Sequence, residues 1–353
     1  MRLGRVATAA SGSCFLKLVF LTGATGFVGA ELVRVLQSNG YEVHALARAN
    51  SDKRIDGSEN VRWHAGDLTQ PTSMKAAISL AAKRATELNT ELLAIHNAAV
   101  ISYRTADRDL QQRVNVEGTR DFLTACRTLG VRRVVHVSSV VAVGTAASVF
   151  DELDEGASFN GAGQRCDYTD TKRAGEELAL RMATDMEVVV VNPGAIYGTA
   201  RVLSNTSKLL KLLNQKPSTG LFAPPGSVSC VGVSDVAEGI VLALERGQSG
   251  RRYILTESNL RWQELYSSAA ELNQSSVRTR TLPDLVWRSI AAGATAVDKI
   301  RPCTFATPQA LRLLRLHYRF SSTRARSELG WSPRPFDEVL RETVLWLADS
   351  DPS

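Results

Sequence analysis

The N-terminal half of the chain alternates between short apolar runs and longer amphipathic stretches. The runs have the length of β-strands, and in the stretches between them apolar residues recur every three or four positions, as on one face of a helix. A run that is apolar throughout indicates a strand covered on both faces, which favours an α/β fold with a doubly wound parallel sheet. We predict strands at 18–21, 42–48, 61–64, 92–96, 133–138 and 187–191, and a long helix over 109–129.

This alternation weakens after residue 198. Ser234 is expected to cap a helix that ends at Leu244, and one more strand is expected at 252–255. The remainder should form mostly short helices with a strand near 277–282, so we predict a smaller, mainly helical C-terminal lobe. The expected boundaries are a disordered extension at 1–15, a sheet domain at 16–198 joined by a returning segment at 229–256, and a lobe formed by 199–228 and 257–353.

A glycine-rich turn joins the first predicted strand to the first helix. Gly23 lets the chain turn, Gly26 lets a backbone approach a pyrophosphate, and Gly29 lets the helix lie against its strand. Three such glycines alone also occur in ordinary loops, so it is the strand and helix on either side that favour the phosphate cradle of a Rossmann-type dinucleotide site. The predicted cofactor contacts in this turn are Thr22, Gly23, Thr25, Gly26, Phe27, Val28 and Gly29.

The second predicted strand ends at Arg48, where a Rossmann fold reads the adenosine ribose. An acidic residue at this point accepts hydrogen bonds from an unphosphorylated ribose, whereas an arginine suits a 2′-phosphate. We therefore expect Arg48 to favour NADP over NAD, and the alternative is a solvent-exposed arginine at a strand end. Lys53 and Arg54 either add to the same positive region or are solvated loop charges.

Two further strand ends carry candidate cofactor contacts. Asp67 and Leu68 follow the third strand, and the carboxylate either accepts from the adenine amino group or caps the helix that begins near Pro71. Ala98 and Ala99 follow the fourth strand, where small residues let the backbone pass close to a flat ligand. All of these positions lie at the carboxyl edge of a parallel sheet, which is where ligands bind in open α/β folds.

A tyrosine and a lysine at the start of a later helix point to proton transfer. Tyr168 and Lys172 are four residues apart, so their side chains share one helix face. A free tyrosine with a pKa of roughly 10 is a poor acid–base catalyst at neutral pH, but a neighbouring ammonium is expected to lower that pKa. A serine at the end of the fifth strand supplies a hydrogen bond to a substrate oxygen. Because such pairs are common on surfaces, the glycine turn and the serine are what make this one informative.

The composition argues against several other classes of protein. A chain of 353 residues with 44% hydrophobic and 22% charged residues can bury a large core in one or two domains. The five cysteines lie far apart and the histidines lie mostly in apolar runs, so we expect a reducing compartment and no metal site. The net charge of +6 is mild, and the arginines of 312–326 are expected to form a solvated helix face. We expect a cytoplasmic protein that binds neither nucleic acid nor membrane.

Together the motifs resemble the extended short-chain dehydrogenase/reductase superfamily, in particular its NAD(P)-dependent epimerase/dehydratase family and the dihydroflavonol-reductase-like branch. The resemblance runs from Leu18 to Leu347 and includes the C-terminal segments, which are similar to the reductase-like branch. Val143 and the polar segment 159–166 depart from the family pattern on the substrate side. The resemblance rests on TGATGFVG at 22–29, GDL at 66–68, HNAA at 96–99, NVEGT at 115–119, SS at 138–139, YTDTK at 168–172 and NPG at 192–194.

The resemblance also implies which residues act. Ser139, five residues before Gly144, is implied to be the catalytic serine beside Tyr168 and Lys172. The implied reaction is hydride transfer between a nicotinamide cofactor and a carbonyl or secondary alcohol of a small organic substrate, by a monomer or a homodimer. The alternatives are an NAD-dependent sugar-nucleotide epimerase or dehydratase and, more remotely, a non-catalytic Rossmann protein. The further cofactor contacts that the resemblance implies are Ser138, Tyr168, Lys172 and Pro193.

Overall fold

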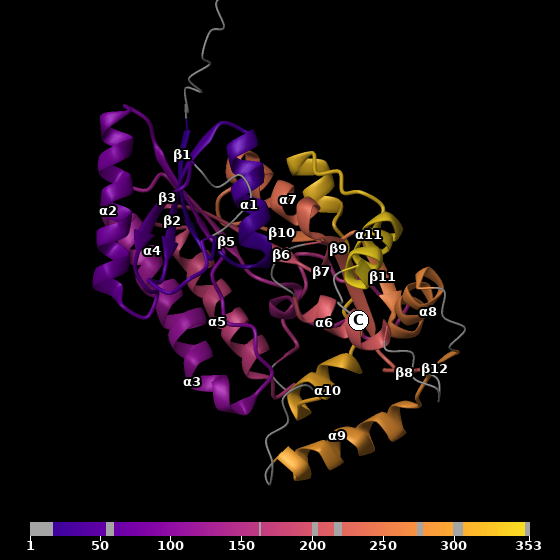
Figure 1. Cartoon of the computed structure of the whole chain (residues 1–353). Coiled ribbons are helices and arrows are strands. Elements are labelled where there is room, and N and C mark those ends of the chain that lie inside the picture. The colour runs from indigo at the N-terminus through magenta and orange to yellow at the C-terminus, as the bar shows by residue number, and fades with distance from the viewer. Residues whose placement is uncertain are drawn as a thin grey trace, which may run out of the picture.

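A seven-stranded parallel sheet forms the centre of the molecule (Figure 1). The computed structural model describes residues 17–53, 60–161, 164–199, 204–214, 221–273, 278–298 and 306–349. The strands lie in the order β10-β6-β5-β4-β1-β2-β3, and every neighbouring pair is parallel. They are β1 Lys17–Thr22, β2 Tyr41–Ala47, β3 Arg62–Ala65, β4 Leu92–His96, β5 Arg133–Val137, β6 Glu187–Pro193 and β10 Arg252–Leu255. The predicted doubly wound fold is confirmed.

Helices cover both faces of this sheet because its strands are apolar on both sides. In β1, Val19 and Leu21 pack into the layer of α1 and α7, whereas Leu18 and Phe20 pack into the layer of α2, α4 and α5. Figure 1 shows the two layers on opposite sides of the strands. The helices are α1 Phe27–Ser38, α2 Pro71–Glu87, α3 Arg108–Gln111, α4 Gly118–Thr128, α5 Asp167–Met182 and α7 Val233–Arg246.

The helix predicted over 109–129 is not regular in its middle. A π-helical segment, Gln112–Glu117, separates α3 from α4. Two contacts account for this widened turn: the Thr119 hydroxyl donates to the Asn115 carbonyl at 2.8 Å, and Gly175 of α5 packs so closely that a Cβ there would lie 2.6 Å from the same oxygen. The prediction of one uninterrupted α-helix is therefore wrong, and π-helical turns of this kind are frequent at functional sites.

The C-terminal part adds helices and short strands beside the carboxyl edge of the large sheet (Figure 1). Its helices include the predicted short ones, but only one of its strands, β12, was predicted from the sequence. The other strands carry no clear periodic signal, because β7 and β8 are only three residues long and β9 and β11 mix polar with apolar residues. The elements are α6 Asn205–Asn214, α8 Trp262–Leu272, α9 Asp284–Asp298, α10 Pro308–Leu314, α11 Phe336–Asp349, β7 Ala195–Tyr197, β8 Leu221–Ala223, β9 Ser227–Gly232, β11 Ser258–Arg261 and β12 Thr279–Thr281.

Ser234 does not cap α7, contrary to the prediction. The helix begins two residues earlier than predicted, at Val233, and Gly232 occupies the N-cap position. The Ser234 hydroxyl instead donates to a carboxylate oxygen of Glu31 in α1, at 2.6 Å. The serine thus ties together the two helices that share one face of the sheet.

Several features bear on the classes of function considered above. None of the described helices is long and apolar enough to cross a membrane. The described residues contain no group of three or more histidine, cysteine or acidic side chains that could hold a metal ion. Cys126, Cys166 and Cys230 are buried free thiols, while Cys14, Cys303 and Arg54 lie outside the described residues. The domain boundaries given above stay predictions.

Substituting alanine at Gly29 should destabilise the fold, because a Cβ there would lie 1.9 Å from the carbonyl oxygen of Gly23. We expect Gly29→Ala to lower the free energy of unfolding by about 3 kcal/mol or more, since backbone must move to relieve the overlap. Gly293→Ala in the exposed part of α9 is the matched control, because nothing lies within 4 Å of the point that its new Cβ would occupy, and it should be stabilising by roughly 0.5–1 kcal/mol. Denaturant unfolding of both variants checks this, and equal stabilities would contradict it.

Candidate active site

The register of the parallel strands brings several predicted site segments to one edge. Thr22 of β1 pairs with His96 of β4, which pairs with His136 of β5, and Val137 pairs with Val191 of β6. The residues that follow these strands therefore lie next to one another at the carboxyl edge. They are the glycine turn, the segment 97–99, the serine pair at 138–139 and the loop after Pro193.

The glycine turn is packed too closely for side chains. Gly23 has φ +73°, and a Cβ on it would lie 2.8 Å from the Cα of Ala98. The Gly23 carbonyl accepts from the backbone N–H of Gly26 at 3.1 Å and from the Asn97 amide at 3.2 Å. A bare backbone cradle at the start of α1 results, and its N–H groups suit the pyrophosphate of a dinucleotide. This part of the site fits a nicotinamide cofactor.

A buried chain of hydrogen bonds lies beneath the turn. The Thr119 hydroxyl donates to the Asn115 carbonyl, so its oxygen is free to accept from His96 Nε2 at 3.0 Å. His96 Nδ1 then accepts from the Thr22 hydroxyl at 2.9 Å, and the Thr22 oxygen accepts from the Ala98 N–H at 3.2 Å. Burial and, to a lesser extent, the charge of Lys172 lower the pKa of His96 to about 3, which keeps the ring neutral. The imidazole is structural, as its position in a strand predicts.

The three predicted catalytic residues lie together beside this chain. Tyr168 and Lys172 are both buried on the same face of α5, and the Ser139 hydroxyl hydrogen-bonds the Tyr168 side chain. The Lys172 ammonium donates to the Val137 carbonyl at the end of β5, at 2.8 Å. Burial lowers the pKa of Lys172 to about 8, an effect that the charge of Glu176 partly offsets. The sequence thus places a proton donor, a hydroxyl and a cation in one small volume.

The expected depression of the tyrosine pKa is wrong for this structure. Burial raises the pKa of Tyr168 to about 12, and the hydrogen bond from Ser139 offsets only part of that effect. The reason is physical: burial would desolvate the phenolate, and this penalty exceeds the stabilisation that the Ser139 hydrogen bond supplies. The phenol is therefore fully protonated at neutral pH.

Asn115 anchors the neighbouring segments, as a buried amide at this position is expected to do. Its side-chain oxygen accepts from the Val100 N–H at 2.8 Å, and its NH₂ group donates to the Val100 carbonyl at 3.0 Å and to the Thr171 hydroxyl at 3.2 Å. The π-helical segment is thereby tied to the loop after β4 and to the helix that carries the catalytic pair.

The predicted cofactor contacts away from the turn differ in their exposure to solvent and in their hydrogen-bond partners. Arg48 is exposed directly after β2, and in the described part of the chain its guanidinium has no ion-pair partner. Asp67 does not cap α2, whose N-cap is Gln70; its carboxylate instead closes a turn on Thr69 with two 2.8 Å contacts. The Ser138 hydroxyl is buried without a partner among the described residues. Leu68 is buried, whereas Ala98 and Ala99 are half-buried and Pro193 ends β6.

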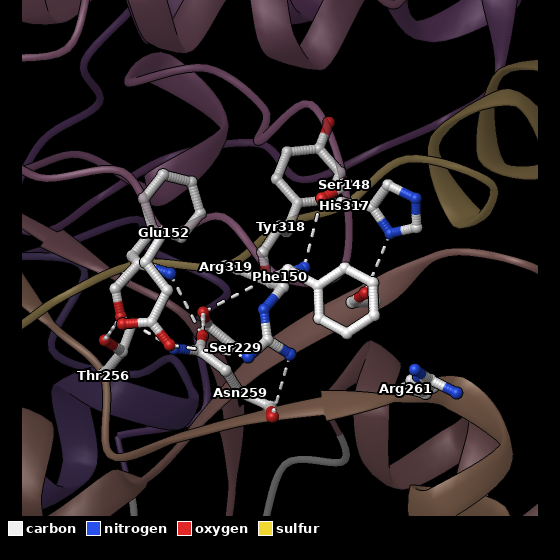
Figure 2. Close-up of polar contacts among 12 residues, drawn as sticks. Ser148, Phe150, Glu152, Ser229, Thr256, Asn259, Arg261, His317, Tyr318 and Arg319 are labelled. Atoms are coloured by element: carbon white, nitrogen blue, oxygen red, sulfur yellow. Dashed lines mark hydrogen bonds and ion pairs between the residues drawn. The ribbon is translucent and has the colours of Figure 1, made fainter.

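The loop between Ser139 and Tyr168 is held by a C-terminal segment, residues 316–321. The Ala146 N–H donates to the His317 carbonyl at 2.8 Å, and the Leu153 N–H donates to the Arg319 carbonyl at 3.0 Å. Figure 2 shows Glu152 of this loop beside Asn259 of β11 and the Arg319 side chain. The Glu152 carboxylate accepts from the Asn259 amide at 2.9 Å and from the Arg319 guanidinium at 3.4 Å.

A second contact from the C-terminal part reaches the start of α5, the helix that carries Tyr168 and Lys172. The Gln309 side chain of α10 accepts from the Asp167 N–H at 3.0 Å and donates to the Asp167 carboxylate at 2.6 Å. The neighbouring Tyr168 ring meets Tyr103 edge-on, with centroids 5.8 Å apart, and shares an apolar cluster with Val143. Sequence reasoning missed Gln309, because no motif or spacing links it to a residue more than a hundred positions away.

Comparisons with known proteins agree with this arrangement. The model of the NAD dependent epimerase/dehydratase family matches residues 19–255. Sterol demethylase protein B of Methylococcus capsulatus is 30% identical over 93% of this chain and 98% of its own length. A putative dihydroflavonol 4-reductase of Synechocystis is 28% identical over 96% of this chain and 95% of its own. The crystal structure of gox2253 superposes with a TM-score of 0.80 and 26% identity, over 94% of this chain and 98% of that one.

The family match covers the glycine turn, the strand ends and the helix of the catalytic pair. It stops at the last strand of the large sheet, and the two relatives extend the similarity through the C-terminal part. The chain belongs to the NAD-dependent epimerase/dehydratase family, the extended type of short-chain dehydrogenase/reductase enzymes, which use a nicotinamide nucleotide cofactor.

Proposed function

We propose that this enzyme is an NADP-dependent reductase acting on a carbonyl group, or in reverse on a secondary alcohol, of a small organic substrate. The observation that carries the proposal is the cluster of the half-buried Ser139 with the buried Tyr168 and Lys172, at the edge of the sheet that also holds the glycine turn. When bound, the nicotinamide cofactor supplies or accepts the hydride. The work left to the protein is to place the carbonyl and to move one proton.

Each of the three side chains has a distinct task. The Tyr168 phenol donates its proton to the carbonyl oxygen as negative charge develops there. The Ser139 hydroxyl donates a hydrogen bond to the same oxygen, and the Lys172 ammonium stabilises the phenolate that remains. At neutral pH the Tyr168 phenol is protonated, as a proton donor must be before the reaction.

The surroundings of Tyr168 favour an apolar substrate. Val143 and Tyr318 belong to the same apolar cluster, and Tyr103 and Val141 pack against it. Two similar proteins are named for a sterol and for a dihydroflavonol, which are compounds with fused rings, and apolar surroundings suit substrates of this kind. A screen of NADPH consumption over aldehydes, ketones, and sterol-like and flavonoid-like carbonyls tests the proposal.

The alternative within the family is an NAD-dependent epimerase or dehydratase. Such an enzyme returns the hydride to its own substrate, so it keeps its cofactor bound and consumes none. Purified protein that carried tightly bound NAD and failed to oxidise NADPH with every carbonyl in the screen would favour this alternative over the proposal.

Replacing Tyr168 by phenylalanine removes the proton donor but keeps the ring. We expect turnover to fall by a factor on the order of a hundred or more, with the dissociation constant for NADPH nearly unchanged. Tyr266→Phe, at a buried tyrosine in the core of the C-terminal part, is the control and should keep normal turnover. Near-normal turnover of Tyr168→Phe, when chemistry limits the rate, would show that another group supplies the proton.

The pH dependence of carbonyl reduction should report Lys172. Its pKa is lowered to about 8, so the ammonium is present below that pH and is lost as the pH rises through it. Because the ammonium stabilises the phenolate formed in the reaction, kcat for reduction should decline above about pH 8. Initial rates between pH 6 and pH 10 at saturating substrates measure this, and a rate that stays level to pH 10 would contradict the role of Lys172.

The exposed Arg48 should set the cofactor preference. A contact between its guanidinium and a 2′-phosphate is worth about 1.5–3 kcal/mol, or roughly ten- to hundredfold in affinity. Arg48→Asp should reverse the preference, because a carboxylate repels the phosphate and accepts from a free ribose. Arg48→Lys keeps the charge and should keep a weaker preference. The measurement is the ratio of kcat/KM for NADPH to that for NADH, and a wild-type ratio of one or less would contradict the predicted preference for NADP.

A further inference from the structure

Glu176 is a fully buried carboxylate on the same helix face as the catalytic pair. It follows Lys172 by four residues in α5, as Lys172 follows Tyr168, so the three side chains line one side of the helix. The carboxylate is completely shielded from solvent. A buried charge is expensive unless it is paired and hydrogen-bonded, so its surroundings indicate what it does.

Two donors from two different strands face this carboxylate. The Asn192 amide of β6 donates to Oε2 at 2.6 Å, and the Arg252 guanidinium of β10 lies 3.3 Å from Oε1. Oε2 thus accepts a hydrogen bond, whereas Oε1 has an ion pair with the guanidinium but no hydrogen bond among the described residues. A glutamine in the same place could satisfy only one of the two, because it has a single acceptor oxygen.

The same amide reaches the catalytic serine. Asn192 Nδ2 also donates to the backbone carbonyl of Ser139 at 3.0 Å, and that carbonyl accepts the Ala142 N–H at 3.0 Å as well. Glu176 of α5 therefore holds the backbone at Ser139 in place through the Asn192 amide. A short hydrogen bond to a buried carboxylate in turn fixes the orientation of the amide.

We propose that Glu176 is a positioning residue. Through Asn192 it holds Ser139 opposite Tyr168. Its negative charge also stabilises the Lys172 ammonium, which would otherwise be left with the positive charge of Arg252 alone. This inference rests on the proposed function for its catalytic meaning. The geometric part, in which Glu176 fixes the Ser139 peptide, holds whatever the substrate is.

The charge balance around Lys172 supports the second half of the proposal. Glu176 is the group that raises the pKa of Lys172 against the effect of burial. From the sheet, His96 and His136 face the ammonium, and burial and the lysine charge keep the pKa of each low, so both are neutral. Arg252 pairs with Glu176 from β10. Without the carboxylate, the buried Lys172 ammonium and the half-buried Arg252 guanidinium would lose the negative charge that they share among the described residues.

Glu176→Gln tests both halves, because it keeps the side-chain volume. We expect kcat for carbonyl reduction to fall roughly tenfold and the NADPH dissociation constant to stay within about twofold. The decline of the rate at high pH should begin roughly one pH unit lower, which corresponds to a tenfold lower proton affinity of Lys172. Backbone amides of residues 139–144 should also exchange with solvent deuterium about tenfold faster. This last readout needs no substrate, so it still decides the positioning claim if no carbonyl is reduced and the proposed function fails.

The adjacent Glu177→Gln is the matched control. Its carboxylate is 42% exposed and pairs with Arg173, so its loss should leave kcat, the NADPH dissociation constant and the pH profile unchanged. Asn192→Ala separates the two halves, since it removes the Ser139 contact but keeps the carboxylate beside Arg252; it should lower kcat and speed exchange with an unshifted pH profile. Glu176→Gln could instead lose only thermal stability and keep the pH profile and amide exchange of the wild type, or the amides of 139–144 in Asn192→Ala could exchange at the wild-type rate. In either case Glu176 would have a purely structural role and the proposal would be wrong.

Discussion

The arrangement of the site depends on burying a lysine ammonium at the edge of a parallel sheet. Lys172 is only 4% exposed, and a cation in such a place must be compensated by fixed polar groups. The Val137 carbonyl and the carboxylate of Glu176 provide this compensation, and the histidines of β4 and β5 stay neutral, so they add no further positive charge. Each of these groups belongs to a strand of the sheet or to α5 itself, so the packing of α5 on the sheet also positions the polar groups around the ammonium.

Close backbone packing is the second constraint. The helix after β1 can approach its strand only because Gly29 has no side chain, and the catalytic helix approaches the π-helical segment only because Gly175 has none. These contacts bring the glycine turn, Asn115 and the catalytic pair within one hydrogen-bonded region. Contacts from the C-terminal part then close the region from the other side: Gln309 holds the start of α5, and the segment 316–321 holds the loop after Ser139.

The sequence predicted the parts of this fold that carry a period or a motif. Strands such as β4 were placed at their observed bounds, and Tyr168 and Lys172 share a buried face as their spacing predicts. The missed features depend on tertiary contacts. The strands β7, β8, β9 and β11 are stabilised by pairing with distant segments, and the Ser234 hydroxyl donates to a carboxylate on another helix instead of capping its own. The raised pKa of Tyr168 results from burial, which no local pattern encodes.

The central claim is that the enzyme passes a hydride from NADPH to a carbonyl carbon while Tyr168 protonates the oxygen. The most direct test is a reaction with NADPH carrying deuterium at the transferring position of its nicotinamide ring and a carbonyl compound found by screening. The account predicts one deuterium on the former carbonyl carbon of the product for each NADP formed. Product that contains no deuterium and forms without oxidation of the cofactor, as in an internal redox cycle, would contradict it.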